Sequence, residues 1–456
     1  MKRVLAGLGA ACVFAVCIVG IVLATHLLHQ QAAAREFTAA GPANLAREEA
    51  SARLEGIPLT AGQLQQPLPP PSQNAAPLYV KLTKLLHDKP LGLPKYAEGM
   101  DAFHTYTPQQ IASVRKTLAA RRDVMTLVHQ AADKPLCVFV RDWSQGSEMA
   151  SSEYRALLAS AWLLKTESYL LARDSRYQEA ATNQARGFRV ADHAASDPVL
   201  IEYLVGVACE SRTLSGMQSI LTLAGPDTHT DTYLSRVVIA NAKRPSLRFA
   251  MAGETGFVCL SFVRMHQAER YGAQEVMRVG GLSADKAKAK NFVPPAEQRR
   301  AHNLIDAWQA DFLGRMRQIV RSCGAPFAKR REVFAAAGRQ SGLIHPTEAV
   351  DLASRVILPV YSLIDQNDTR IHAREAVTLA AAALLAGKAE IGAYPAILPP
   401  GFVDPFTNRS LLYKREGTGF VVYSAGPTGR FDGGKPGVKV PGQESLFRYP
   451  VVPAPN

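Results

Sequence analysis

The sequence predicts a mainly α-helical protein, built as an antiparallel, repeat-like array of helical hairpins, with an N-terminal transmembrane helix and a small C-terminal β-hairpin. Three observations predict this fold class. An apolar run starts at residue 4, directly after two basic residues. Apolar residues then recur at helical spacing over most of residues 74–390, while β-forming residues gather only after residue 410.

Length and composition are those of a globular protein with more than one part. The 456 residues suffice for about two to three domains, and 47% of them are hydrophobic against 20% charged. The mean hydropathy of −0.04 excludes a protein with many membrane spans. We expect four segments: a transmembrane anchor (1–29), a helical and then proline-rich linker (30–73), a helical body (74–390), and a C-terminal β-hairpin segment with its tail (391–456).

The N-terminus indicates a signal anchor. Lys2 and Arg3 precede the apolar run Val4–Leu28. About 20 helical residues cross the ~30 Å hydrocarbon core of a membrane, and a positive flank stays in the cytoplasm. The run is longer than the roughly 7–15-residue core of a cleaved signal peptide. We therefore expect an uncleaved single-pass anchor in the cytoplasmic (inner) membrane with a periplasmic body; cleavage near Ala32–Ala34 is the alternative.

The net charge of +13 is compatible with nucleic acid, an anionic membrane surface or an acidic polymer as partner. The basic residues are spread over many helices and are densest between Lys286 and Arg331. No nucleic-acid-binding motif accompanies them. We therefore expect solvated helix faces and attraction to anionic lipid, and no nucleic-acid partner.

Four cysteines lie beyond the apolar run, and an exported protein can form disulfides. Four cysteines allow three pairings, and the sequence does not choose among them. Two of the four stand in apolar helical stretches, where a free buried thiol is the common state. The four are Cys137, Cys209, Cys259 and Cys323.

The chain after the anchor is predicted to form a helix and then an extended spacer. The proline-rich run Pro67–Pro71 favours stiff, extended chain between anchor and body. Asn74 can cap a helix, and Thr107 before Pro108 indicates a second helix start. An irregular link, Cys137–Gly146, separates these helices from the next group.

The rest of the body is predicted to form medium-length helices with short links, as in antiparallel helical hairpins. No fixed 34-residue period accompanies them, so the array is repeat-like and no tetratricopeptide array. A polar loop is expected over 280–296. We expect helices beginning near residues 154, 177 and 200, and then over 296–322, 332–339, 346–364 and 369–390.

Few residues suggest chemistry, because the motifs of nucleophile elbows, zinc proteases, phosphate loops and dinucleotide folds are missing. Asp142 and Trp143 lie in the irregular link, either as a binding pair or as a turn residue and a core aromatic. Glu254 lies inside an apolar helix, either as a buried functional carboxylate or in an ion pair with Arg212 or Arg248.

The C-terminal stretch predicts a β-hairpin. Two runs of β-forming residues, 411–415 and 420–424, flank the turn-forming Glu416–Gly419. A glycine-rich loop with one carboxylate, Asp432, follows. Since an isolated hairpin is only marginally stable in water, we expect it to pack on the helix 369–390.

Several motifs of the body occur in a recognisable order. They are Gly56-Ile-Pro-Leu-Thr, Asn74-Ala-Ala-Pro-Leu-Tyr, Cys137-x-Phe-x-x-Asp142 with Gly146, Asp197-Pro-Val-Leu-Ile and Gly253-Glu254. In this order they resemble a group of uncharacterised, membrane-anchored helical proteins of planctomycete-type bacteria. No activity is established for that group, so the resemblance implies architecture and location only.

A second resemblance covers about 45 residues at the C-terminal end. It rests on a long helix followed by Gly392-x-Tyr-Pro, Asp404-Pro-Phe, Leu412-Tyr and Gly419-Phe-x-x-Tyr-Ser-x-Gly. This part is similar to the hairpin region of type II secretion major pseudopilins, in which the following loop binds calcium. The resemblance implies Asp432 as the candidate calcium ligand. Thr428 departs from the family pattern, as do the missing downstream carboxylates, and calcium takes about 6–8 oxygen ligands. We therefore expect a shared structural hairpin.

Together these observations favour a non-enzymatic binding or scaffold protein of the bacterial envelope, held in the membrane and working with protein partners. No cofactor is expected unless the loop binds calcium. One alternative is an envelope enzyme in which Glu254 or Asp142 is the acid or base in a helical cleft. Another is an accessory secretion component.

Overall fold

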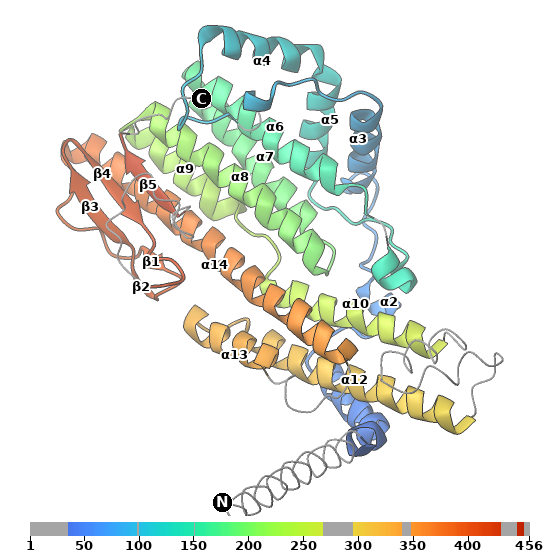
Figure 1. Cartoon of the computed structure of the whole chain (residues 1–456). Helices are drawn as coiled ribbons and strands as arrows, with labels where there is room; N and C mark the ends of the chain where they lie inside the picture. Colours follow the sequence, from blue (N-terminus) through green and yellow to red (C-terminus); the bar gives the residue numbers. More distant parts are fainter. Residues whose placement is uncertain are drawn as a thin grey trace, which may run out of the picture.

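A computed structural model of the chain describes residues 35–97, 100–149, 151–267, 295–339, 348–429 and 445–450 (Figure 1). It confirms a mainly helical protein with a small antiparallel β-sheet. The expected anchor, residues 1–29, lies outside the described residues. Among the helices that are described, none combines the length and the apolar character that crossing a membrane requires.

The helical elements follow one another along the chain with short links. Residues 35–54 form the first described helix. After it come α2 (Ala61–Leu64), α3 (Ala76–Asp88), η1 (Lys95–Ala97), α4 (Pro108–Ala120), α5 (Arg122–Ala132), η2 (Trp143–Glu148), α6 (Tyr154–Arg173), α7 (Tyr177–Ala194), α8 (Leu200–Ala224), α9 (Thr228–Asn241), α10 (Leu247–Gln267), α12 (Pro295–Ser322), α13 (Phe327–Arg339) and α14 (Glu348–Ile391).

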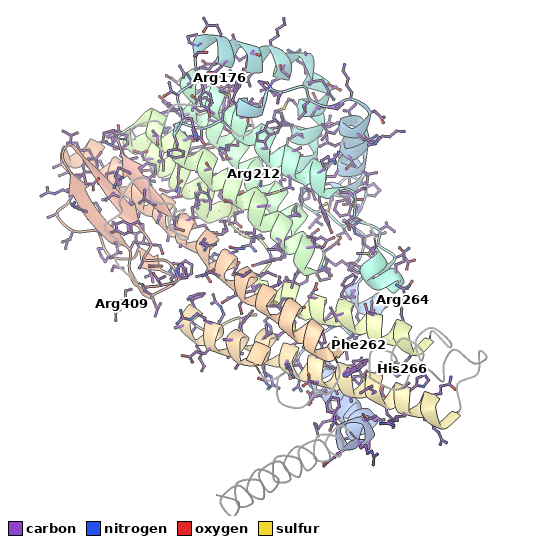
Figure 2. The ribbon with its side chains drawn as sticks, viewed as in Figure 1. Arg176, Arg212, Phe262, Arg264, His266 and Arg409 are labelled. Carbon is purple, nitrogen blue, oxygen red and sulfur yellow. The ribbon has the colours of Figure 1, made fainter. Side chains whose placement is uncertain are left out.

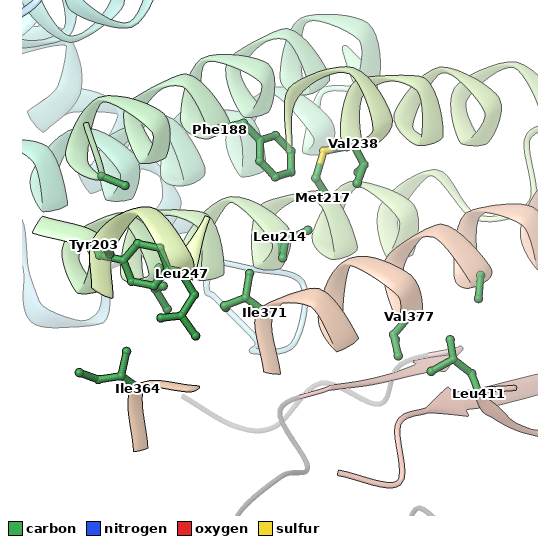
Figure 3. Close-up of a cluster of buried hydrophobic side chains, with 14 of the residues drawn as sticks. Phe188, Tyr203, Leu214, Met217, Val238, Leu247, Ile364, Ile371, Val377 and Leu411 are labelled. Atoms are coloured by element: carbon green, nitrogen blue, oxygen red, sulfur yellow. The ribbon is translucent and has the colours of Figure 1, made fainter. Parts of the chain in front are cut away.

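The main core lies where α7, α8, α9 and α14 meet (Figure 3). Phe188 and Met217 lie there beside Val238 of α9, and Leu214 of α8 lies toward Ile371 of α14. The α14 helix runs beside α8 in the same direction, since Tyr203 bonds Asp368 and, further along both helices, Gln218 bonds Thr378. It runs opposite to α9, where the Thr228 hydroxyl donates to the Ala386 carbonyl. Helix α14 is therefore the element that joins the end of the chain to its middle.

Helices α6, α7 and α8 pack against one another, with α3 and α5 on the outer side of α6 and α7. Glycines permit the close approach of α7 and α8. A Cβ on Gly187 would lie 2.5 Å from the Thr213 hydroxyl, and one on Gly216 would lie 2.4 Å from the Gln184 amide. Larger residues at these two positions would force the helices apart.

The expected spacer between anchor and body lies against the body. Ile57 and Leu64 are 2% and 1% exposed, and the Thr60 side chain caps α2 with a reciprocal bond from Gln63. Upstream, the helix 35–54 lies along α12, where Arg317 binds the carboxylates of Glu48 and Glu55. The proline run Pro67–Pro71 itself forms no helix or strand and is mostly exposed, so the contacts with the body are made by the residues before it.

One expected boundary is wrong, because residues 348–364 of the first expected helix and residues 369–390 of the second belong to a single helix, α14 (Glu348–Ile391). The polar stretch around residue 366 looked like a break. Its carboxylates instead have partners in the fold: Asp365 binds Arg330 of α13 and Asp368 binds Arg244. Satisfied in this way, they remain inside the helix and do not end it.

The sheet confirms the expected hairpin. Strands β3 (Leu412–Glu416) and β4 (Gly419–Tyr423) pair in antiparallel register, and Gly417 takes a φ of 56° in the turn. A third strand, β5 (Leu446–Tyr449), was not expected and pairs with β4. Strands β1 (Val403–Asp404) and β2 (Arg409–Ser410) form a separate short pair. The β4 and β5 strands contact α14, so the hairpin packs on the helix that was expected to carry it.

The four cysteines beyond residue 29 are free thiols. Cys137, Cys209 and Cys259 are buried, and Cys323 is partly buried. Burial, as the largest influence, raises the pKa of both Cys209 and Cys259 to about 12. These thiols are therefore apolar packing groups at neutral pH.

Candidate functional site

The residues with unusual electrostatics gather around the first turns of α8, where α10, α14 and the Cys137–Glu148 link converge. Glu254 of α10 is one of them. Its Oε2 accepts a hydrogen bond from the backbone N–H of Leu200 at 3.1 Å. Burial raises the pKa of this carboxyl group, with the Leu200 bond opposing. Glu254 thus satisfies one of the orphan N–H groups at the start of α8.

The absence of a side chain at Gly253 explains how the Glu254 carboxylate of α10 reaches α8. A Cβ on Gly253 would lie 1.6 Å from the carbonyl oxygen of Pro198. The backbone of α10 can therefore touch the turn before α8 only because residue 253 has no side chain. The two arginines expected as partners of Glu254 have other contacts. Arg212 donates to the Ala208 carbonyl, and Arg248 donates to the carbonyls of Val320 and Glu55.

A buried cluster surrounds Arg141, one residue before the expected Asp142. The Arg141 guanidinium lies 2.9 Å from Asp197, 3.2 Å from Glu153 and 3.7 Å from Glu202. It also stacks over the ring of Phe139, 4.6 Å from the ring centre. One cation faces three carboxyl groups, so the cluster is acidic, and desolvation together with repulsion disfavours full ionisation.

Glu202 is the member of this cluster that retains a proton most readily. Burial raises its pKa to about 7, Asp197 adds to the effect, and Tyr154 and Arg141 oppose it. Its Oε1 accepts from the Tyr154 hydroxyl at 2.7 Å and from the Ser151 hydroxyl at 3.3 Å. Its Oε2 is buried without a hydrogen-bond partner among the described residues. The side chain is 3% exposed, so this carboxyl group faces the interior.

The two residues expected in the link are placed differently from each other. Trp143 is buried; its Nε1–H donates to Gln65, and its ring meets the edge of Phe257. Asp142 is exposed and accepts from Ser144 and Gln145, which follow it. These bonds lower its pKa, that of the Ser144 side chain most strongly. Trp143 is thus a core aromatic and Asp142 is a turn-forming residue.

A second cluster lies one to three turns further along α8 and was not expected from the sequence. Arg244, in the link between α9 and α10, is 3% exposed. It lies 2.7 Å from Glu210 and 2.9 Å from Asp368, and its guanidinium stacks over the Tyr203 ring at 4.4 Å. The Tyr203 hydroxyl donates to the same Asp368 oxygen. This cluster fastens α8, α14 and the α9–α10 link together.

His372 connects the second cluster to the surface. Its ring is half exposed, with Nδ1 3.3 Å from Glu375 and Nε2 3.6 Å from Asp368. Burial acts against the charged ring, but Glu375 and Asp368 outweigh it and raise the pKa of His372 to about 9. The imidazole is therefore protonated at neutral pH, with both nitrogens turned to carboxylates, and is not an available base.

Nearby, burial and the Glu375 carboxylate raise the pKa of Glu210, although Arg244 opposes this. Glu375 keeps its charge because His372 outweighs the effect of burial and lowers its pKa. The glutamates therefore divide their roles: Glu210 holds a proton more readily, and Glu375 remains the partner of the imidazolium.

The described residues do not test the calcium site that the resemblance implies in the C-terminal loop. Asp432 lies outside the described residues. Within the described ranges, no three His, Cys, Asp or Glu side chains come together as metal ligands.

Comparison of the chain with models of protein families, with curated proteins and with solved structures found no match.

Proposed function

We propose that the chain is a membrane-anchored, extracytoplasmic binding or scaffold protein of the bacterial envelope. The N-terminal apolar run with its two preceding basic residues supports the anchor and its orientation. The helical body supports the binding role. Helices α6, α7 and α8 pair as antiparallel hairpins, a repeat-like architecture that offers extended surfaces to partners.

One observation carries the choice of a scaffold over an enzyme: the carboxyl groups of the candidate site, Glu254, Glu202 and Glu210, each bond a neighbouring element inside the fold. Glu254 accepts the Leu200 N–H, and Glu202 and Glu210 are 2% exposed with partners on neighbouring elements. An acid or base must reach the atom whose proton it moves. Asp142, the accessible candidate, is engaged in its own turn.

Location is tested with the full-length chain carrying alkaline phosphatase at its C-terminus, a reporter that is active only outside the cytoplasm. We expect active reporter that stays in the membrane fraction after alkaline carbonate extraction. Inactive reporter, or reporter released by carbonate, would contradict the anchored, exported arrangement. The matched control lacks residues 1–29 and is expected to remain in the cytoplasm with an inactive reporter.

The binding role is tested by cross-linking the intact, membrane-held protein in cells and identifying its partners. Discrete protein adducts are expected. Recovery of pseudopilins among them would favour the accessory secretion role suggested by the hairpin. An enzymatic activity that Glu254→Gln or Glu202→Gln abolishes, without loss of folding, would replace the scaffold proposal.

A further inference from the structure

Two stripes of exposed and partly exposed residues adjoin on the helical body. In α8, the residues between 201 and 215 that are not buried recur every three or four positions and so share one face: Ile201, Leu204, Ala208, Ser211, Arg212 and Ser215. In α14, a stripe with spacings of three and four consists of Val360, Leu363, Asn367, Arg370 and Arg374.

A direct contact shows that the stripes adjoin. Arg374 of α14 donates to the backbone carbonyl of Ser211 at 3.2 Å and to its hydroxyl at 3.0 Å. We call the combined surface the α8–α14 face. Figure 2 shows Arg212 in the middle of the helical body. The face runs along α8 for about 21 Å, since residues 201 to 215 rise about 1.5 Å each.

The two ends of the face differ in chemistry. At one end lie large apolar side chains with unusual exposure: Ile201 is 51% exposed, Leu363 59% and Val360 45%. At the other end lie three arginines, Arg212, Arg370 and Arg374, and neither stripe contains a carboxylate. A surface with both an apolar and a single-sign charged part is typical of a binding site.

The carboxylates nearest to the face are used inside the protein. Asp368 and Glu210 bind Arg244, and Glu202 lies in the Arg141 cluster. Glu375, which follows Arg374 and is partly exposed, faces His372. The positive charge even reaches the buried Lys165. Burial, followed by the charges of Arg374 and Arg212, acts to lower the pKa of Lys165, against the effect of its partner Asp101. Among the described residues, Arg212 donates to a backbone carbonyl and Arg370 to Asn367, and neither forms an ion pair with a carboxylate.

We propose that the α8–α14 face binds an acidic, amphipathic segment of a partner protein. The apolar side chains of that segment would pack on Ile201 and Leu363, and its carboxylates would bind Arg212 and Arg370. The length of the face suits about four helical turns of such a segment. This inference rests on the proposed scaffold function, for which it supplies the site and the class of partner.

Two other occupants fit the face less well. One is the segment 430–444, which lies outside the described residues; Ser445, which follows it, donates its hydroxyl to the Arg370 carbonyl of the face. That segment holds three basic and two acidic residues, a net charge of +1, which an arginine-rich face repels.

Anionic lipid is the second alternative occupant of the face. The helix 35–54, which follows the expected anchor, lies along α12, and α14 stands between α12 and α8 (Figure 1). A membrane at the anchor would then lie away from this face.

The test measures binding of synthetic fluorescent peptides to the full-length chain in detergent. The probe is a helix-forming peptide with leucines at one end and glutamates at the other. A peptide with lysine in place of glutamate and vesicles of phosphatidylglycerol are the comparison probes. We expect the glutamate peptide to bind, the lysine peptide not to bind, and the affinity to fall as salt is added.

Variants locate the site. Arg212→Glu and Leu363→Asp are each expected to weaken binding of the glutamate peptide by about tenfold or more. Arg299→Glu changes the charge equally at an exposed position of α12 and is expected to leave binding unchanged. Arg212→Lys, which keeps the charge, is expected to retain most of the affinity, and thermal unfolding confirms that each variant is folded.

Three results would overturn the inference: equal binding of both peptides, equal loss for Arg299→Glu and Arg212→Glu, or vesicle binding that Arg212→Glu abolishes while peptide binding is absent. Each concerns the occupant of this face. The location assay and the cross-linked partners test the scaffold function independently, so an exported protein with partners elsewhere would remove the inference alone.

Discussion

The Glu254 carboxylate of α10 accepts the backbone N–H of Leu200 at the start of α8, across 3.1 Å. The bond joins α10 to α8 through the Leu200 N–H, which has no acceptor within α8 because it lies in the first turn. Gly253 makes the approach possible, because any side chain there would meet Pro198. The adjacent Gly-Glu pair is thus a structural device in which one residue provides the space and the other provides the cap.

Replacing Glu254 by alanine should lower the free energy of unfolding by about 2 kcal/mol, because a buried N–H loses its acceptor. Glu254→Gln keeps an acceptor oxygen and removes the ionisable group. Burial raises the folded-state pKa above its ordinary value of 4.5. The folded state therefore favours the protonated form of Glu254. The stability that this protonation adds is full at low pH and is lost as pH rises through the folded-state pKa.

Urea unfolding at about pH 5 and about pH 8 checks both statements. Relative to the unsubstituted protein, Glu254→Gln should gain stability at the higher pH. A glutamine variant that loses as much as alanine at both values would contradict the account of Glu254 as a cap.

Arg244 holds the second cluster, and its removal should be severe. Arg244→Met leaves Glu210 and Asp368 without their buried partner and should lower the free energy of unfolding by about 3–5 kcal/mol. Arg244→Met combined with Glu210→Gln should recover part of this loss, as a double-mutant cycle would show. Arg176→Met removes an exposed ion pair with Glu179 and should leave the free energy of unfolding nearly unchanged, because solvent screens such a pair.

The sequence predicted the helices whose signals are local. Thr107 before Pro108 marked α4, and apolar spacing marked α6 to α8. The β3–β4 hairpin followed from alternating β-formers around a glycine turn. These features depend on neighbours a few residues apart, so a single sequence contains the information for them.

The features that were missed depend on residues far apart in the chain. Arg244 meets Glu210 at a separation of 34 residues and Asp368 at 124. No spacing rule connects an arginine in a link with carboxylates on two helices. The continuity of α14 was missed for the same reason, since Asp365 and Asp368 look like a break until their arginine partners are known. Strand β5 has too few residues to be recognised by its pattern.

His193 should make the protein less stable in acid. Its ring is buried between two groups: Nε2 lies 3.0 Å from the Lys134 carbonyl and Nδ1 lies 3.0 Å from the Tyr79 hydroxyl. A carbonyl only accepts, so Nε2 holds the proton and Nδ1 accepts from Tyr79. Burial lowers the pKa of His193 to about 3 against an ordinary value of 6.5.

The neutral ring contributes its full stability above about pH 6.5, and the contribution falls as pH decreases because the unfolded chain takes up the proton. The loss should be about 1.4 kcal/mol per pH unit between about pH 6 and pH 4. His193→Gln can donate to Lys134 and accept from Tyr79 but does not titrate. Its unfolding free energy should therefore fall less steeply with acid; equal slopes would contradict the assignment.

Gly253→Ala tests the contact between α10 and the turn before α8. A methyl group there would lie 1.6 Å from the Pro198 carbonyl oxygen, so the two segments must separate. The cost should be about 1–3 kcal/mol or more, measured by chemical unfolding. Gly62→Ala in α2 is the control: no atom lies within 4 Å of its new methyl group, and the higher helix propensity of alanine should stabilise the protein by up to about 1 kcal/mol.

Asp404 closes the C-terminal sheet, and its loss should loosen that end of the protein. Its carboxylate accepts from Phe406 N–H at 3.0 Å, from the Ser424 hydroxyl at 2.9 Å and from Ala425 N–H at 2.8 Å. Asp404→Ala should cost about 2–3 kcal/mol, because these donors are left in a buried site. Hydrogen exchange of β4 should increase more than that of α6, which is remote from Asp404.

Calcium is expected not to stabilise the loop after β4. That loop offers Asp432 but lacks the downstream carboxylates of the pseudopilin pattern, and calcium takes about 6–8 oxygen ligands. We therefore expect millimolar calcium to leave the melting temperature unchanged, since only a ligand that binds the folded state raises it. A rise that Asp432→Ala abolishes and Asp142→Ala does not would instead assign calcium to the loop after β4. Magnesium at the same concentration separates such a site from a general ionic effect, because magnesium demands a tighter octahedral arrangement.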